Sequence, residues 1–212
     1  MALKDSIQHR IDENLARVES LKKIYVSIRG QGQGRRDASK ADILRAAVVL
    51  LHASLEDFLR SLSRWKLPSE GTKQALDKIP FAGSGRPEKV LLGYLAGYRG
   101  KTVDELIGES VDSYLDRSNY NNVTQIFSAL KVIGVEIDLP KPIYTYLNDM
   151  IKRRHLIVHR ADRDDTGGYG KHRVKSISAG TVEIWTDAVR NFSSLVLAEL
   201  KTEIWDSYER NT

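Results

Sequence analysis

Hydrophobic residues recur along most of this chain at steps of three and four positions, the spacing that lines one face of an α-helix. The first such run covers residues 3 to 28 and predicts a long amphipathic helix with the face Ile7, Ile11, Leu15, Val18, Leu21, Tyr25 and Ile28. The glycine-rich, polar run from Gly30 to Arg36 predicts a connector after it. This run lacks a Gly-Lys-Ser/Thr ending and follows no strand, so we do not interpret it as a nucleotide site.

The densest apolar run extends from Ala41 to Trp65 and predicts a central helix that is buried on most of its circumference. Ser39 is a candidate N-cap for this helix. Three polar residues, His52, Glu56 and Asp57, fall among the core positions, and we interpret His52 as structural. A buried Glu56 needs a cation or a hydrogen-bond donor as partner. The alternative is that Glu56 and Asp57 form a polar edge of the helix.

Shorter helices are predicted between residues 66 and 140, where the pattern is interrupted at Pro68, Gly71, Pro80, Gly83, Gly85 and Gly100. Thr102 and Glu105 have the spacing of a capping box, which begins a helix that continues to about Arg117. A second short helix is predicted from Asn121 to Ile133. Pro142 suits the first turn of a third, whose apolar face continues to Val158.

A loop over residues 162 to 180 and a long final helix complete the pattern, the helix being marked by Val182, Trp185, Val189, Phe192, Leu195 and Leu200. No convincing strand competes, so the predicted fold class is all-α, a helical bundle with long antiparallel helices and additional short ones. We expect one domain over residues 1–212, with an N-terminal helix (1–30), a flexible loop (31–38) and a core (39–209). Trp205 and Tyr208 are interpreted as core or dimer packing.

Composition narrows the functional classes. The 41% hydrophobic content supports a proper core, and no apolar run is long enough to span a membrane. Charges throughout the first 30 residues argue against a signal peptide, so we expect a cytoplasmic protein. The absence of cysteine excludes disulfides, thiol nucleophiles and cysteine-based zinc sites. A net charge of +5 permits attraction to polyanions without requiring it.

Two histidines lie within a local basic cluster formed by Lys152, Arg153, Arg154, Arg160 and Arg163. On a helix His155 and His159 share a face, and Arg154, about 140° away from His159, can reach the same ligand. Imidazole can exchange a proton with a ribose hydroxyl near neutral pH, and guanidinium can bind a phosphate through two hydrogen bonds. These groups are sufficient for cleaving RNA without a metal or another cofactor.

Other readings of the same residues remain open. Two histidines four apart can bind zinc, but Leu156 stands where a zinc protease of this spacing has glutamate, so we predict no metal. Arg154 and both histidines could instead stabilise the C-terminus of the helix through its dipole. Lys152, Arg153, Arg160 and Arg163 are candidate RNA-backbone contacts, although charge runs are usually solvated surface.

The segment from Arg154 to His159 resembles the signature of the HEPN superfamily, an Arg followed after four to six residues by His, often with a polar residue such as His155 after the Arg. The sequence Leu55-Glu56-Asp57-Phe58 on the predicted central helix is similar to the acidic position on the early core helix of the RiboL-PSP branch. The resemblance covers roughly residues 39 to 205.

This resemblance implies a helical bundle that forms a homodimer, with the two motif helices facing each other across a composite ribonuclease site. Arg154 would stabilise the scissile phosphate, His159 would act as acid or base, His155 would assist, and Glu56 would orient Arg154. Attack by the RNA's own 2′-OH would give a 2′,3′-cyclic phosphate and a 5′-hydroxyl. Many members act in toxin, antiphage or stress systems, so an antitoxin or another regulatory protein is a possible partner.

One departure from the family concerns Ala161, which stands two residues after the histidine, where toxins silenced by a nucleotidyltransferase have tyrosine. We therefore do not expect control by AMP transfer at that position. The alternative functions are a non-catalytic HEPN-like module that binds RNA or protein, and a helical scaffold that only dimerises.

Overall fold

The computed structural model describes residues 3–28, 40–81, 91–163 and 174–200, and in these ranges the chain is helical, as the sequence predicts. The elements are α1 (Leu3–Ile28), α2 (Asp42–Glu70), α3 (Lys73–Leu76), the 3-10 helix η1 (Leu92–Tyr98), α4 (Val103–Arg117), α5 (Val123–Val132), α6 (Lys141–Arg160) and α7 (Ala179–Glu199). Within the described ranges no strand forms, and an isolated bridge joins Arg163 to Val174. None of the described helices combines the length and apolar character that crossing a membrane requires.

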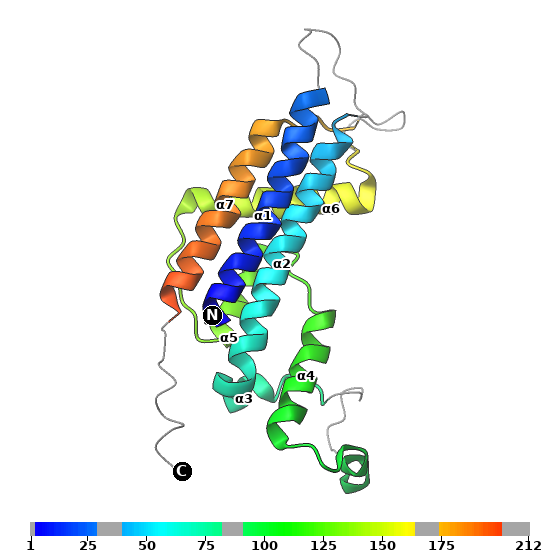
Figure 1. The fold of residues 1–212 in the computed structure, drawn as a ribbon, viewed down its shortest axis with the longest axis vertical. Helices are drawn as coiled ribbons and strands as arrows, with labels where there is room; N and C mark the ends of the chain where they lie inside the picture. The colour runs from blue at the N-terminus through cyan, green and yellow to red at the C-terminus, as the bar shows by residue number, and fades with distance from the viewer. Residues whose placement is uncertain (1–2, 29–39, 82–90, 164–173, 201–212) are drawn as a thin grey trace.

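Three long helices, α1, α2 and α7, lie side by side and form one layer of the fold (Figure 1). α2 runs antiparallel to α1, as predicted, and α7 runs in the same direction as α2 (Figure 1). The apolar face expected for α1 is buried at Ile7, Ile11, Leu15, Val18 and Tyr25. α2 is the central element, because it contacts α1, α4, α5, α6 and α7.

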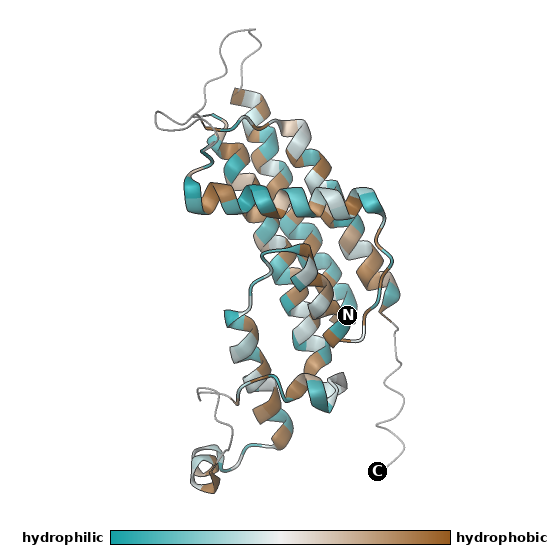
Figure 2. Ribbon diagram, turned by 180° about the vertical axis from the view of Figure 1, so that it is seen from behind, coloured by the Kyte–Doolittle hydropathy of each residue, from teal (hydrophilic) through white to brown (hydrophobic). Residues whose placement is uncertain are grey.

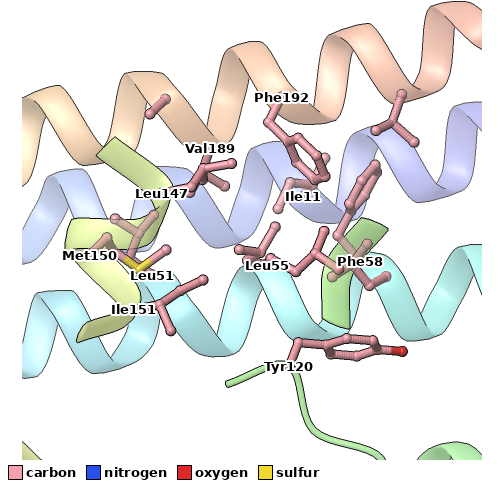
Figure 3. Close-up of a cluster of buried hydrophobic side chains, with 14 of the residues drawn as sticks. Ile11, Leu51, Leu55, Phe58, Tyr120, Leu147, Met150, Ile151, Val189 and Phe192 are labelled. Atoms are coloured by element: carbon pink, nitrogen blue, oxygen red, sulfur yellow. The ribbon is translucent and has the colours of Figure 1, made fainter. Parts of the chain in front are cut away.

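α6 crosses the long helices on the opposite side of the layer from the view of Figure 1, and it is seen in front in Figure 2. Its inner face carries Leu147, Met150 and Ile151, all of which are buried. These side chains meet Leu51 of α2 and Val189 of α7 in the core shown in Figure 3. The packing therefore fixes which face of α6 points outward.

The edge-to-face contact between Phe58 of α2 and Phe192 of α7 joins the far end of the same core, with ring centroids 6.4 Å apart (Figure 3). This is a favoured geometry for aromatic pairs. Leu55 beside it is fully buried. The dense apolar pattern of the central helix thus corresponds to contacts on nearly all sides.

Helix boundaries in the middle of the chain follow the predicted capping chemistry. The Oγ1 atom of Thr102 accepts from the backbone N–H of Glu105, and the Glu105 carboxylate accepts from the backbone N–H of Thr102, which completes the capping box of α4. α5 begins after Asn122, whose side chain accepts from the N–H of Gln125. α6 starts one residue before Pro142, which therefore lies in its first turn.

The predicted boundaries of α2 are wrong at its C-terminal end. The helix does not stop at Trp65 but continues through Pro68 to Glu70, and the N–H of Gly71 bonds to the carbonyl of Leu67. Because Pro68 lies in the last turn, its missing N–H costs one helical hydrogen bond and only two helical residues follow it. At the other end α2 begins after Ala41, which gives no side-chain cap. The candidate cap Ser39, the loop 31–38, Trp205 and Tyr208 lie outside the described residues.

Candidate active site

The basic and histidine-rich segment occupies the last two turns of α6, as predicted. Burial of Met150 and Ile151 one turn earlier sets the rotation of the helix. His155 and His159 consequently face outward and are exposed, whereas Arg154 is half-buried at the edge of the core-facing side. The histidines and Arg154 thus lie on neighbouring faces of one helix end.

The two histidines form a pair. Their ring centroids are 4.5 Å apart and the rings are tilted by 47°, which brings the two imidazoles together on one surface. The prediction that they share a face is therefore confirmed. Two imidazoles at this separation can approach one phosphodiester and its ribose, where one can accept a proton and the other donate one.

Arg154 is turned towards α2. Its Nε atom is buried, and none of the described residues accepts a hydrogen bond from it. The positive charge of this guanidinium affects the pKa of His52, a fully buried residue of α2. Burial lowers the pKa of His52, the Glu56 carboxylate opposes the shift, and the positive charge of Arg154 lowers the pKa further. His52 is therefore neutral at neutral pH.

The tautomer of His52 follows from its contacts. Its Nε2 lies 3.1 Å from the backbone carbonyl of Tyr120. Because a carbonyl can only accept, Nε2 must carry the proton and donate it. The unprotonated Nδ1 then lies 3.9 Å from Oε1 of Glu56.

Glu56 is buried and has polar partners, as its burial requires. They do not include Arg154, which Glu56 was expected to orient. Its Oε1 accepts from the backbone N–H of Tyr120 at 3.2 Å, and its Oε2 lies 3.4 Å from the guanidinium of Arg60. Among the described contacts no hydrogen bond or ion pair joins Glu56 to Arg154. Both charges influence the pKa of His52, in opposite directions, although the sequence alone indicates only a structural role for this residue.

Asp57, the other acid of the central helix, faces α1. Its carboxylate accepts two hydrogen bonds from the guanidinium of Arg10, at 2.6 and 2.7 Å, and one from Asn14 at 3.3 Å. The polar edge considered for Glu56 and Asp57 is therefore divided, with Asp57 joining α2 to α1 and Glu56 bonding to Tyr120 and Arg60.

The basic residues around the histidines differ in their surroundings. Lys152, Arg160 and Arg163 are exposed. Arg153 instead points inward, where its guanidinium contacts the buried carboxylate of Asp162 and donates to the carbonyls of Lys175 and Ser176. Arg153 therefore has an internal role that the charge pattern did not reveal, and we leave it out of the proposed RNA-contacting set.

In the part of the chain that the structure describes, no group of three or more His, Asp or Glu side chains is close enough to hold a metal ion.

The sequence profile of the RiboL-PSP-HEPN family matches residues 12–196. This range includes the central helix α2, the motif helix α6 and nearly all of α7. The chain belongs to the RiboL-PSP-HEPN family. A search of curated proteins and a search of solved structures each found no match.

Membership confirms the resemblance that the motif Arg154–His159 and the acidic α2 suggested, and the described all-α fold is that of a HEPN domain. In this RiboL-PSP-HEPN protein the two histidines come together at the end of α6 with Arg154 on the neighbouring face, whereas Glu56 makes no described contact with them and shares with Arg154 only an electrostatic influence on His52. The sequence gives no sign that His52 lies near the candidate site, because a single histidine in an apolar helix is most simply interpreted as a core residue.

Proposed function

We propose that this RiboL-PSP-HEPN protein is a metal-independent endoribonuclease in which Arg154 and His159 carry the chemistry and His155 assists. Family membership supports a HEPN-type ribonuclease or a related binding module. The exposed imidazole pair beside a half-buried guanidinium supports the catalytic alternative.

The observation that carries the proposal is the contrast between two neighbouring arginines. Arg153 uses its guanidinium inside the protein, on Asp162 and two backbone carbonyls. The Nε atoms of both arginines are buried without a hydrogen bond, but that of Arg153 lies 2.7 Å from Oδ1 of Asp162, whereas no hydrogen bond or ion pair joins the guanidinium of Arg154 to a described residue. A buried donor without a partner is costly, by about 1–3 kcal/mol. A phosphate oxygen would supply an acceptor for this half-buried guanidinium and would form a charge-assisted hydrogen bond.

The chemistry requires no group beyond these residues and the RNA. The 2′-oxygen attacks the adjacent phosphorus as one imidazole removes the proton of the 2′-OH. The bond from phosphorus to the 5′-oxygen breaks, and the leaving oxygen takes a proton from the acid. Arg154 stabilises the negative charge that develops on the phosphoryl oxygens. The products are a 2′,3′-cyclic phosphate and a 5′-hydroxyl.

A second copy of the chain completes the proposed site. In one chain both histidines lie on an exposed surface, where water screens charges and weakens electrostatic stabilisation. A homodimer that brings two α6 helices face to face would exclude water and double the number of imidazoles and guanidinium groups. Lys152, Arg160 and Arg163 would then contact the RNA backbone at the rim. A role in a toxin, antiphage or stress system, with an antitoxin or another regulatory partner, rests on the family resemblance.

Cleavage of a labelled RNA by matched pairs of variants tests this proposal. Arg154→Ala and His159→Ala should each lower the cleavage rate at least about a hundredfold. Arg17→Ala and His9→Ala, which alter exposed residues of α1, should retain it within about twofold. Equal rates for Arg154→Ala and Arg17→Ala in folded proteins would refute the role of Arg154.

The second candidate function is a non-catalytic module that binds RNA or a protein through the same surface. The exposure of Lys152, His155, His159 and Arg160 in a single chain favours this candidate, because contact residues need access and not enclosure. It predicts that the wild-type protein binds RNA without cleaving it, and that Lys152→Ala weakens binding as much as His159→Ala does.

A further inference from the structure

Directly after the motif helix lies a fully buried carboxylate, that of Asp162, which has no exposed surface. Its Oδ2 accepts from Nε of Arg45 on α2 at 2.7 Å and from Nη2 of Arg153 on α6 at 2.8 Å. Its Oδ1 lies 2.7 Å from Nε of Arg153, an ion pair without the alignment of a hydrogen bond. One carboxylate thus joins the two helices through two cations.

The same two arginines also bind the chain that returns towards α7. Nη2 of Arg45 and Nη2 of Arg153 both donate to the carbonyl of Lys175, each at 2.9 Å. The N–H of Lys175 donates to the carbonyl of Asp162 at 2.9 Å. Asp162, Arg45 and Arg153, which we call the Asp162 clamp, therefore hold three segments together that are up to 130 positions apart.

The backbone at the end of α6 is held in a costly conformation. Ala161 and Asp162 have φ angles of 49° and 59°, in the left-handed region that side chains disfavour. The N–H of Asp162 donates to the carbonyl of Leu156, which closes the helix end. Two successive non-glycine residues in this region cost about 1 kcal/mol each or more, so the clamp must offset this cost.

The clamp acts at the residues of the proposed site. Arg153 precedes Arg154 directly, and Asp162 follows His159 by three positions. Arg45 lies two helical turns before His52, the α2 residue whose pKa is lowered by the charge of Arg154. Fixing the last turn of α6 against α2 therefore fixes where Arg154 and His159 lie relative to the core.

We propose that Asp162 is a positioning residue that holds the end of α6, and with it Arg154 and His159, in place against α2 for catalysis, an inference that rests on the proposed ribonuclease function. Asp162 contacts no substrate in this role. Reaction geometry is sensitive to displacements of about 1 Å, which can reduce rates by about a hundredfold. Loosening the clamp should therefore reduce turnover much more than RNA binding.

The test compares Asp162→Asn with Asp57→Asn, in which a carboxylate that pairs with Arg10 is lost on the side of α2 that faces α1. For Asp162→Asn we expect kcat to fall at least about tenfold while KM changes less than about threefold, measured well below the melting temperatures of all variants. Asp57→Asn should keep both values within about twofold. A folded Asp162→Asn protein with wild-type kcat would overturn the proposal.

Amide hydrogen exchange separates this inference from the ribonuclease proposal. In Asp162→Asn, exchange over residues 155–160 should become at least about tenfold faster while α4 and α7 remain as in the wild type. Unchanged exchange over residues 155–160 would overturn the clamp even if RNA is cleaved. Faster exchange there in a protein whose wild type cleaves no RNA would refute the ribonuclease and leave the clamp as a structural device.

A second variant is available if Asp162→Asn does not fold. Arg45→Lys keeps the positive charge beside Asp162 but cannot reproduce the three donor directions of the arginine. It should lower kcat about threefold and increase exchange over residues 155–160. Wild-type values for both quantities would contradict the positioning role.

Discussion

His52 shows how a single buried side chain relates the core to the candidate site. It lies on the central helix, donates to the carbonyl of Tyr120, and is influenced by the opposite charges of Glu56 and Arg154. Its neutral form is the one that the fold accommodates, because burial and Arg154 together outweigh the attraction of Glu56. Arg154 therefore has a neutral imidazole in its surroundings. Protonation of His52 at acidic pH would add a second positive charge there.

The stability of the protein should consequently depend on pH through His52. The unfolded residue titrates near 6.5 and the folded one at a lower pKa, so on acidification the unfolded state takes up a proton first. The free energy of unfolding should fall as the pH decreases below 6.5, by at most about 1.4 kcal/mol per pH unit from this group. Denaturant titrations between pH 7 and 5 measure this slope.

The matched variants are His52→Gln, whose amide can still donate to the Tyr120 carbonyl, and His9→Gln on the surface of α1. We expect a flatter pH dependence for His52→Gln and an unchanged one for His9→Gln. If the free energy of unfolding depends on pH in the same way for the wild type and His52→Gln, the pKa of His52 is not lowered by folding.

At the scale of single elements, local sequence signals determined most boundaries. The capping box of α4 and the asparagine cap of α5 are local and appear as predicted. The C-terminal end of α2 was predicted wrongly because tertiary contacts of Leu67, which is buried, favour one more turn despite Pro68. α5 ends in a Schellman motif, in which Val135 N–H bonds to Leu130 and Gly134 N–H to Lys131.

Gly134 allows a direct test of this helix end, because its φ of 74° lies in the left-handed region and a Cβ there would meet nothing within 4 Å. Gly134→Ala should therefore destabilise the protein by about 1 kcal/mol through backbone strain alone. Gly108, inside α4, is equally open but lacks a positive φ, so Gly108→Ala should instead stabilise by up to about 1 kcal/mol. Chemical denaturation measures both changes, and equal signs would contradict the assignment.

At the scale of the whole molecule, the sequence predicts features that depend on a local pattern, such as a helix. It does not predict contacts between residues that are far apart in the chain. The apolar periodicity of α1, α2 and α7 predicts the long helices, because the spacing of apolar residues within each segment defines the face that it buries. The shared face of His155 and His159 follows from helix geometry alone.

The contacts that sequence reasoning missed join residues far apart in the chain. Arg45 and Asp162 are separated by 117 positions, and Glu56 meets Tyr120 across 64. No periodicity or spacing connects such residues. Arg153 and Arg154 look alike in sequence, and only the buried carboxylate of Asp162 distinguishes the internal arginine from the one proposed to bind phosphate.

The central claim is that the end of α6 cleaves RNA without a metal, and the most direct measurement is the chemistry of the product ends. Pure wild-type, Arg154→Ala and His159→Ala proteins are incubated with total RNA and with tRNA in EDTA, folding is checked, and the ends are identified. We predict that the wild type gives 2′,3′-cyclic phosphate and 5′-hydroxyl ends and that both variants give neither. No cleavage, equal cleavage by all three proteins, or fragments with 3′-hydroxyl ends would contradict the account.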